Sequence, residues 1–223
     1  MSNHYSKTEY YRYDKSNMQI ICLDLEGVLI PEIWIAFAEK TGIEKLKATT
    51  RDISDYDVLM KQRIELLSQH DLKIGAIQEV VAELEPLPGA KDFLDGLRQD
   101  YQVIILSDTF YEFAQPLIEQ LAWPTLFCHR LDVAEDGEVV NYLLRQQDPK
   151  RQSVKALKQL KYSVFAAGDS YNDLSMLSEA DAGFLFRAPQ KVIEEFPEYA
   201  STDDYDSLRR FFNEAARQAV QPS

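Results

Sequence analysis

The chain has 223 residues, of which 45% are hydrophobic and 11% aromatic, so it has enough apolar side chains for a substantial core and is not a disordered protein. Its formal net charge of −13 at pH 7 opposes binding to nucleic acid and to anionic membrane surfaces. An anionic small molecule still binds where a metal, a cation or a helix N-terminus reverses the local field. We therefore expect small-molecule substrates and no nucleic-acid partner.

The sequence carries no sign of membrane insertion or export. No apolar run approaches the length of a membrane span, and the first residues lack the apolar segment of a secretory signal. Cys22 and Cys128, the only cysteines, lie in apolar strand-like runs, and we expect both to be reduced core residues. These features predict a cytoplasmic protein that does not bind membranes.

The first predicted strand ends in two carboxylates. Residues 1–17 are polar and tyrosine-rich, so we expect a flexible N-terminal extension ahead of an apolar run at residues 20–23. Asp24 and Glu26 follow that run directly, at the end of the strand where open α/β sheets bind ligands. One carboxylate could attack a substrate while the other moves protons. Two acids at this spacing also occur in ordinary polar turns. The choice between a catalytic pair and such a turn therefore depends on the rest of the chain.

A helical segment separates this strand from the next. Residues 32–86 show apolar spacing typical of helices and contain no strand-like run, whereas Pro86 and Pro88-Gly89 return the chain to the sheet. We therefore predict a small helical insert.

Helices and strands then alternate. We predict helices near residues 89–99, 111–121 and 150–160, strands at 102–107, 125–128 and 164–168, a hairpin of 131–133 with 139–144, and a last strand at 182–186. This alternation predicts an α/β fold with a doubly wound, mostly parallel, Rossmann-like sheet.

Polar side chains follow three of these strands. Asp24 and Glu26 follow the first, Ser107 to Thr109 the second, and Asp169 to Asp173 the strand at 164–168. Hydroxyl and carboxylate groups gathered in this way, with Lys150 and Arg151 opening a helix, suit a phosphate held beside a hard cation.

These residues resemble the motifs of the haloacid dehalogenase superfamily of aspartyl-phosphate phosphotransferases. The matching residues are Asp24-Leu25-Glu26-Gly27, Ser107, Lys150, and Gly168-Asp169 through Asp173. The insert resembles the cap of the phosphoserine phosphatase branch, with residues 56–63 matching its substrate-binding helix. The resemblance implies a haloacid dehalogenase fold with a catalytic core at 18–31 and 87–223 and a helical cap domain at 32–86.

Two departures from the family pattern narrow the resemblance. Glu26 stands where the family usually has Asp, and Ser107-Asp108-Thr109 replaces the usual Ser-Gly-Gly. With residues 31–34, these departures resemble the bifunctional phosphoserine phosphatase/homoserine phosphotransferase subgroup. The implied activity is Mg²⁺-dependent transfer of phosphate from phosphoserine to water or homoserine through an aspartyl-phosphate.

The resemblance implies a role for each acid. Asp24 is the expected nucleophile, and Glu26 the residue that protonates the leaving oxygen and then deprotonates the acceptor. The expected Mg²⁺ ligands are Asp24, Asp169 and the backbone carbonyl of Glu26, with Asp173 in the outer shell.

The resemblance also implies the residues that hold the substrate. Ser107 and Lys150 are expected to bind the phosphoryl group with the help of backbone N–H groups near Asp108, and Arg63 is expected to bind the substrate carboxylate. Whether Lys150 or Arg151 points inward is open, although the family match favours Lys150. His70 and His129 match no motif, and we expect them to be structural. The expected substrate-binding residues are Glu32, Tyr56, Arg63, Ser107, Asp108, Thr109, Lys150 and Asn172.

Two alternatives remain open. One is a plain small-metabolite phosphatase that uses only water as acceptor. The other is a signalling receiver domain, which also phosphorylates an Asp beside Mg²⁺, but the insert and the chain length disfavour it. The oligomeric state is also open, as is the balance of hydrolysis and transfer.

Overall fold

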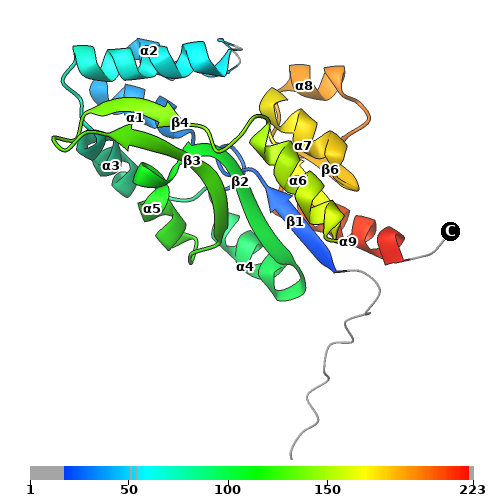
Figure 1. The fold of residues 1–223 in the computed structure, drawn as a ribbon. Coiled ribbons are helices and arrows are strands. Elements are labelled where there is room, and N and C mark those ends of the chain that lie inside the picture. The colour runs from blue at the N-terminus through cyan, green and yellow to red at the C-terminus, as the bar shows by residue number, and fades with distance from the viewer. Residues whose placement is uncertain (1–17, 51, 54, 221–223) are drawn as a thin grey trace, which may run out of the picture.

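The apolar run that precedes Asp24 forms the central strand of a mostly parallel sheet (Figure 1). A computed structural model describes residues 18–50, 52–53 and 55–220, so the predicted extension at 1–17 lies outside the described residues. In this described part of the chain the sheet has seven strands in the order β4-β3-β2-β1-β5-β6-β7, and only β3 and β4 pair antiparallel. The strands are β1 (Gln19–Leu23), β2 (Gln102–Phe110), β3 (Thr125–Val133), β4 (Val139–Leu143), β5 (Ser163–Gly168), β6 (Ala182–Phe186) and β7 (Ala200–Thr202).

Strand β1 is apolar from Ile20 to Leu23 because both faces of the sheet are covered. Ile21 and Leu23 belong to one buried apolar cluster, and Ile20 and Cys22 belong to a second cluster on the opposite face. Strand β1 pairs in parallel with β2 and with β5, so the carboxyl ends of these three strands meet at one edge. The predicted doubly wound fold is confirmed.

Helices form a layer on each face (Figure 1). The first layer contains α4 (Ala90–Asp100), α5 (Tyr111–Gln120) and α9 (Tyr205–Val220). The second contains α6 (Pro149–Gln159), α7 (Leu174–Glu179) and α8 (Gln190–Glu195). Helix α6 begins with Pro149, whose fixed φ favours a first helical turn and whose missing N–H is not needed there.

The insert between β1 and β2 is helical, as predicted. It contains α1 (Ile33–Thr41), the 3₁₀ helix η1 (Glu44–Lys47), α2 (Tyr56–Gln69) and α3 (Ile74–Glu83). Helix α2 begins after Asp55, whose carboxylate accepts hydrogen bonds from the backbone N–H groups of Asp57 and Val58. Helix α3 packs on α5, and apolar residues of α1 and α3 belong to the same buried cluster as Ile21. The insert is therefore anchored to the sheet layers by a continuous apolar core.

The hairpin of β3 and β4 also contacts the insert. The backbone N–H of Ile74 donates to the carbonyl of Gly137 at 2.9 Å, and Lys73 pairs with Asp136 at 2.8 Å. Helix α2 packs against β4 in addition. The hairpin thus holds the insert from a second side.

Some sequence-based predictions of the elements were wrong or incomplete. The strand at 182–186 is not the last, because β7 pairs in parallel with it. Helices α8 and α9 were not predicted. The separately predicted segments 125–128 and 131–133 are one strand, β3. Strand β7 is missed because a three-residue Ala-Ser-Thr strand has no apolar pattern.

The two cysteines are buried and unpaired, as predicted. Among the described residues, no helix has the length and apolar character needed to cross a membrane. The cytoplasmic location stays a prediction.

Candidate active site

A small cavity opens where the carboxyl ends of β1, β2 and β5 face the insert. Its volume is about 80 Å³, far below the size of a site for a drug-sized ligand, which suits a small metabolite. Predicted site residues and additional ones line it: Asp24, Glu26, Glu32, Trp34, Thr49, Thr50, Tyr56, Leu59, Arg63, Ser107, Asp108, Lys150, Asp169, Ser170 and Asn172. The fold therefore brings together predicted site residues that lie up to 148 positions apart in the chain, from Asp24 to Asn172.

Asp24 is held at the end of β1 by hydrogen bonds and an ion pair. Its backbone N–H donates to the carbonyl of Ala167 on β5 at 3.0 Å, and Oδ1 accepts from the N–H of Leu25 and from Lys150 Nζ, both at 2.8 Å. Burial, together with the charges of Asp173 and Asp169, raises the pKa of Asp24 well above the usual carboxyl range, and Lys150 offsets this only in part. An added cation would favour the ionised form of this carboxylate.

The loop after β5 supplies the other acids. Asp173, fully buried, accepts hydrogen bonds from the backbone N–H groups of Asp169 and Ser170 through Oδ2 and from Lys150 through Oδ1. A Cβ on Gly168 would lie 2.3 Å from Asp173 Cγ, so only glycine allows this turn. Because both oxygens of Asp173 are engaged and the residue does not line the cavity, its position suits the predicted outer-shell role.

Lys150 points into the site and Arg151 points away. The Lys150 side chain is 3% exposed and lies 2.8 Å from Asp24, 2.7 Å from Asp173 and 3.5 Å from Asp108. Burial opposes its charge, but Asp173, Asp24 and Asp108 together raise the pKa of Lys150 well above its usual range. Arg151 is half exposed and pairs with Glu179. Lys150, which the family match favoured over Arg151, is therefore the residue that points into the site.

Strand β2 carries an irregularity at the predicted Ser107-Asp108-Thr109 turn. The strand continues to Phe110, and its register with β3 shifts between Leu106 and Phe110. Such a bulge redirects side chains, and here it turns Ser107 and Asp108 toward the cavity. Thr109 is 2% exposed and does not line the cavity, so the prediction that it binds substrate is not supported by its position.

Glu26 and Glu32 form a pair of carboxyl groups at the insert side. Glu26 Oε2 accepts from the N–H of Ile33 at 3.0 Å. Burial, followed by the charge of Glu32, raises the pKa of Glu26 to about 8. Glu26 is therefore protonated at neutral pH, which is the state that a general acid needs.

Arg63 is a buried cation on α2 without an ion pair among the described residues. Its guanidinium donates to the carbonyl of Ala48 at 2.9 Å and stacks over Trp34, with 4.6 Å from Cζ to the ring centroid. Its Nε atom has no hydrogen-bond partner among the residues that the structure describes, and burial lowers the pKa of Arg63 to about 10. Within the described part of the chain no carboxylate forms an ion pair with this guanidinium, and its position in the cavity suits an anionic group.

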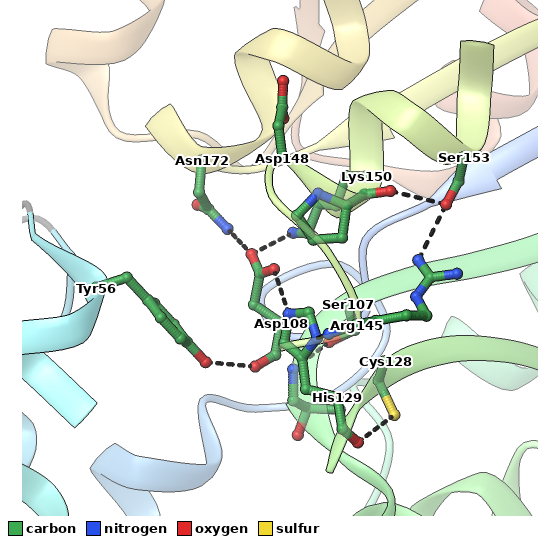
Figure 2. A network of polar contacts seen from close by, with 12 residues as sticks. Tyr56, Ser107, Asp108, Cys128, His129, Arg145, Asp148, Lys150, Ser153 and Asn172 are labelled. Carbon is green, nitrogen blue, oxygen red and sulfur yellow. Dashed lines mark hydrogen bonds and ion pairs between the residues drawn. The ribbon is translucent and has the colours of Figure 1, made fainter. Parts of the chain in front are cut away.

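Two further predicted residues, Tyr56 of the insert and Asn172 of the core, contact Asp108 (Figure 2). The Tyr56 hydroxyl donates to the backbone carbonyl of Asp108 at 3.0 Å, and the Asn172 amide donates to Asp108 Oδ2 at 3.1 Å. Tyr56 opens α2, and Asn172 lies in the 3₁₀ helix η2 (Tyr171–Asp173). Both side chains thus meet at Asp108.

Sequence reasoning missed part of the site. The lining residues Trp34, Thr49, Thr50, Leu59 and Ser170 were not predicted, although Trp34 and Ser170 stand within or beside the quoted motifs. His129 was expected to be structural, yet its Nε2 lies 3.3 Å from Asp108 Oδ1. No local pattern marks His129, because the contact depends on the pairing of β2 with β3.

The acids offer a site for a divalent cation. Carboxylate oxygens of Asp24, Asp169 and Asp173 lie within 4.8 Å of one another, and all three residues are buried. A Cβ on Gly27, which has φ +77°, would lie 2.6 Å from Asp169 Oδ2, so glycine lets the backbone approach this carboxylate closely. Oxygen donors on a buried, strongly negative site suit Mg²⁺.

A sequence model of the haloacid dehalogenase-like hydrolases matches residues 18–181. The chain belongs to this family. The matched range includes Asp24, Ser107, Lys150 and Asp169, and the resemblance inferred from these motifs is confirmed.

Two Pseudomonas proteins are similar to this haloacid dehalogenase-like hydrolase along most of their length. It is 63% identical to the phosphoserine phosphatase ThrH of Pseudomonas aeruginosa over 203 residues, which are 91% of this chain and 99% of the relative. It is 62% identical to a phosphoserine phosphatase of Pseudomonas syringae pv. tomato over 203 residues, 91% of this chain and 86% of that one.

Solved structures share the fold. A phospho-aspartyl intermediate analogue of phosphoserine phosphatase superposes with a TM-score of 0.73 at 20% identity, covering 87% of this chain and 99% of that one. A substrate-bound phosphoserine phosphatase complex superposes with a TM-score of 0.71 at 20% identity, covering 89% and 98%.

Proposed function

We propose that this protein is a Mg²⁺-dependent phosphoserine phosphatase that also transfers the phosphoryl group to homoserine. The observation that carries the proposal is the composition of the cavity. The core supplies Asp24 with Lys150, and the insert supplies the guanidinium of Arg63, which forms no ion pair with a described carboxylate. A substrate with a phosphate at one end and a carboxylate at the other satisfies both groups, and two relatives of more than 60% identity are named phosphoserine phosphatases.

In the first step Asp24 attacks phosphorus. A bond forms between an Asp24 carboxylate oxygen and phosphorus while the bond between phosphorus and the serine oxygen breaks. Glu26, protonated because its pKa is about 8, gives its proton to the departing oxygen. The products are the aspartyl-phosphate and serine.

In the second step Glu26 acts as the base. Its carboxylate takes the proton of the incoming hydroxyl group, whose oxygen bonds to phosphorus as the bond to Asp24 breaks. Water as the acceptor yields inorganic phosphate, and homoserine yields phosphohomoserine. Asp24 and protonated Glu26 are restored in either case.

A bound Mg²⁺ would be held by Asp24, Asp169 and the backbone carbonyl of Glu26, with Asp173 behind them. Its positive charge would reduce the repulsion between an anionic nucleophile and an anionic phosphate. Asp173 contributes by binding the backbone N–H groups of Asp169 and Ser170, which fixes the loop that carries Asp169.

Residues of the core and the insert orient the substrate. Ser107, Lys150 and Asn172 hold the phosphoryl oxygens, and backbone N–H groups of the β2 bulge assist. Arg63 binds the substrate carboxylate, and Glu32 its ammonium group. Tyr56 closes the pocket by its hydrogen bond to Asp108. In this proposal residues 32–86 act as the cap and residues 18–31 and 87–223 as the catalytic core.

The transferase half of the proposal rests on the bulge. Asp108 and Glu26, which depart from the family pattern, both line the cavity and leave it polar and narrow. An acceptor hydroxyl held in line with the bond between Asp24 and phosphorus reacts as if it were at very high concentration. Closure of the cap over the cavity excludes water, which is the competing acceptor. A plain phosphatase remains the alternative.

Product analysis tests the proposal. The protein is incubated with O-phospho-L-serine and Mg²⁺, with and without homoserine, and inorganic phosphate and phosphohomoserine are quantified. We expect homoserine to divert product to phosphohomoserine with serine release undiminished. Phosphate as the sole product at saturating homoserine would contradict the transferase, and no serine release would contradict the phosphatase.

A further inference from the structure

His129 is a buried polar residue for which the mechanism above has no role. It lies on β3, is 2% exposed, and packs its ring edge-on against Tyr56 at a centroid distance of 6.4 Å. Its partner in the register of β2 and β3 is Phe110, the residue at which the bulge of β2 ends. The bulge therefore places Asp108 beside the imidazole of His129 (Figure 2).

The hydrogen bonds of His129 define its tautomer. The backbone N–H of Arg145 donates to Nδ1 at 3.2 Å, so Nδ1 must be an acceptor. The proton of the neutral ring is then on Nε2, which lies 3.3 Å from Asp108 Oδ1 and donates to it. Both ring nitrogens are thus satisfied in one orientation of the ring.

Asp108 connects His129 with the phosphoryl pocket. Its Oδ1 faces His129, whereas its Oδ2 lies 3.1 Å from the Asn172 amide and 3.5 Å from Lys150 Nζ. Although burial opposes the negative charge, Lys150, His129 and Asn172 together lower the pKa of Asp108 below the usual carboxyl range. Asp108 is therefore ionised at neutral pH, and the orientation of its carboxylate decides which oxygen faces Lys150.

The orientation matters because Lys150 is shared between carboxylates. Lys150 Nζ lies 2.8 Å from Asp24 and 3.5 Å from Asp108. Without a donor at Oδ1, the Asp108 carboxylate would be free to rotate and offer a second oxygen to Lys150. Lys150 would then be drawn away from Asp24 and from the place of the phosphoryl group.

We propose that His129 is a positioning residue: by donating from Nε2 to Asp108 it holds that carboxylate so that Lys150 and Asn172 face the phosphoryl group. This inference rests on the proposed phosphoserine phosphatase activity. His129 does not touch the substrate, and its effect passes through Asp108.

Two substitutions separate the hydrogen bonds of His129. In His129→Asn the amide lies near the position of Nδ1, so it still meets the N–H of Arg145 but cannot reach Asp108. In His129→Gln the amide nitrogen lies near the position of Nε2 and still donates to Asp108. His70→Asn, at an exposed histidine outside the site, is the matched control.

We expect His129→Asn to lower kcat/KM for phosphoserine by about tenfold or more, because a hydrogen bond to a charged group is lost. His129→Gln should recover activity to within about threefold of the wild type, and the control should equal it. The loss should be the same for a small phosphate ester without a carboxylate, since the phosphoryl end of the pocket is disturbed and Arg63 is not.

A double-mutant cycle distinguishes positioning through Asp108 from general damage. In an Asp108→Ala background, which removes the acceptor of the His129 hydrogen bond, His129→Asn should cause no further loss, because the two substitutions break the same link. Losses that multiply in the double variant, an unimpaired His129→Asn protein, or a His129→Gln protein as poor as His129→Asn would each overturn the proposal.

Nitrogen NMR of the wild-type imidazole gives a readout that needs neither turnover nor a variant. We expect the His129 ring proton on Nε2 and an unprotonated Nδ1, and a proton on Nδ1 would contradict the hydrogen bond to Asp108. A wild-type protein that fails to hydrolyse phosphoserine would instead contradict the proposed function, and the NMR result would still decide the contact of His129 with Asp108.

Discussion

Lys150 Nζ lies 2.8 Å from Asp24 Oδ1, and both side chains are almost completely buried. The same ammonium group lies 2.7 Å from Asp173, so a single lysine is shared by the predicted nucleophile and a neighbouring acid. One positive charge cannot balance these acids together with Asp169 and a phosphate. Because of this excess negative charge we expect the site to need a further cation, and the first two predictions rest on that expectation.

Asp24→Asn should abolish turnover and keep the fold. The amide preserves the shape of the side chain but is not a nucleophile. The pKa of Asp24 is raised in the folded, metal-free protein. At any pH above the ordinary carboxyl pKa of the unfolded chain, Asp24 therefore lowers the stability of the folded state. At pH 7 without Mg²⁺, the melting temperature of Asp24→Asn should therefore equal or exceed that of the wild type.

Phosphate release and thermal melting check this prediction. Activity within about tenfold of the wild type would mean that Asp24 is not the nucleophile. A clear fall in melting temperature in metal-free buffer would mean that its hydrogen bonds outweigh the charge repulsion.

Asp169→Ala should eliminate phosphoserine hydrolysis, and so should chelation of divalent metal. The reason is the buried group of oxygen ligands formed by Asp24, Asp169 and Asp173, which requires a positive charge before it accepts a phosphate. Mg²⁺ added back after chelation should restore activity to the wild type but not to Asp169→Ala. Full activity of the wild type in exhaustively chelated buffer would contradict the metal requirement.

Arg63→Ala should raise KM for phosphoserine by roughly tenfold or more, while a small phosphate ester without a carboxylate should be hydrolysed as by the wild type. The guanidinium is buried and has no ion pair with a described carboxylate, so its charge is available to the substrate. Arg63→Lys serves as the control, because lysine keeps the charge but cannot bind a carboxylate in the bidentate manner of arginine. Its KM for phosphoserine should lie between those of the wild type and Arg63→Ala. Equal losses on both substrates would indicate that Arg63 supports the fold of α2.

The rate of aspartyl-phosphate formation should fall as the pH rises through about 8. Glu26 has a pKa of about 8 because it is buried and lies beside Glu32, and it must be protonated to act as the acid. Glu32→Gln removes the neighbouring negative charge, so the pKa of Glu26 should fall and the alkaline limb should move to lower pH by about one unit or more.

Single-turnover release of serine across the pH range measures this limb. Glu39→Gln, at an exposed residue on α1, removes one carboxylate charge away from Glu26 and should leave the limb in place. An unchanged limb in Glu32→Gln would show that Glu26 does not titrate in this step.

The sequence by itself determined the central sheet and the chemical character of the site. A strand buried on both faces must be apolar throughout, so the runs before Asp24 and Asp169 could be identified as strands without a structure. In parallel strands the residues after such runs meet at one edge, and this predicted that Asp24, Ser107 and Asp169 lie together. The helical insert was predictable from the same kind of pattern.

Only the tertiary structure decided how neighbouring residues divide between cavity and surface. Successive side chains on a helix are turned by about 100°, so the placement of Lys150 inside and Arg151 outside depends on how α6 packs against the sheet. The bulge in β2, which brings Asp108 inward and leaves Thr109 behind it, depends on pairing with β3. His129 meets Asp108, and β7 joins β6, for the same reason: each contact is set by the register between distant strands, and no local pattern of residues encodes it.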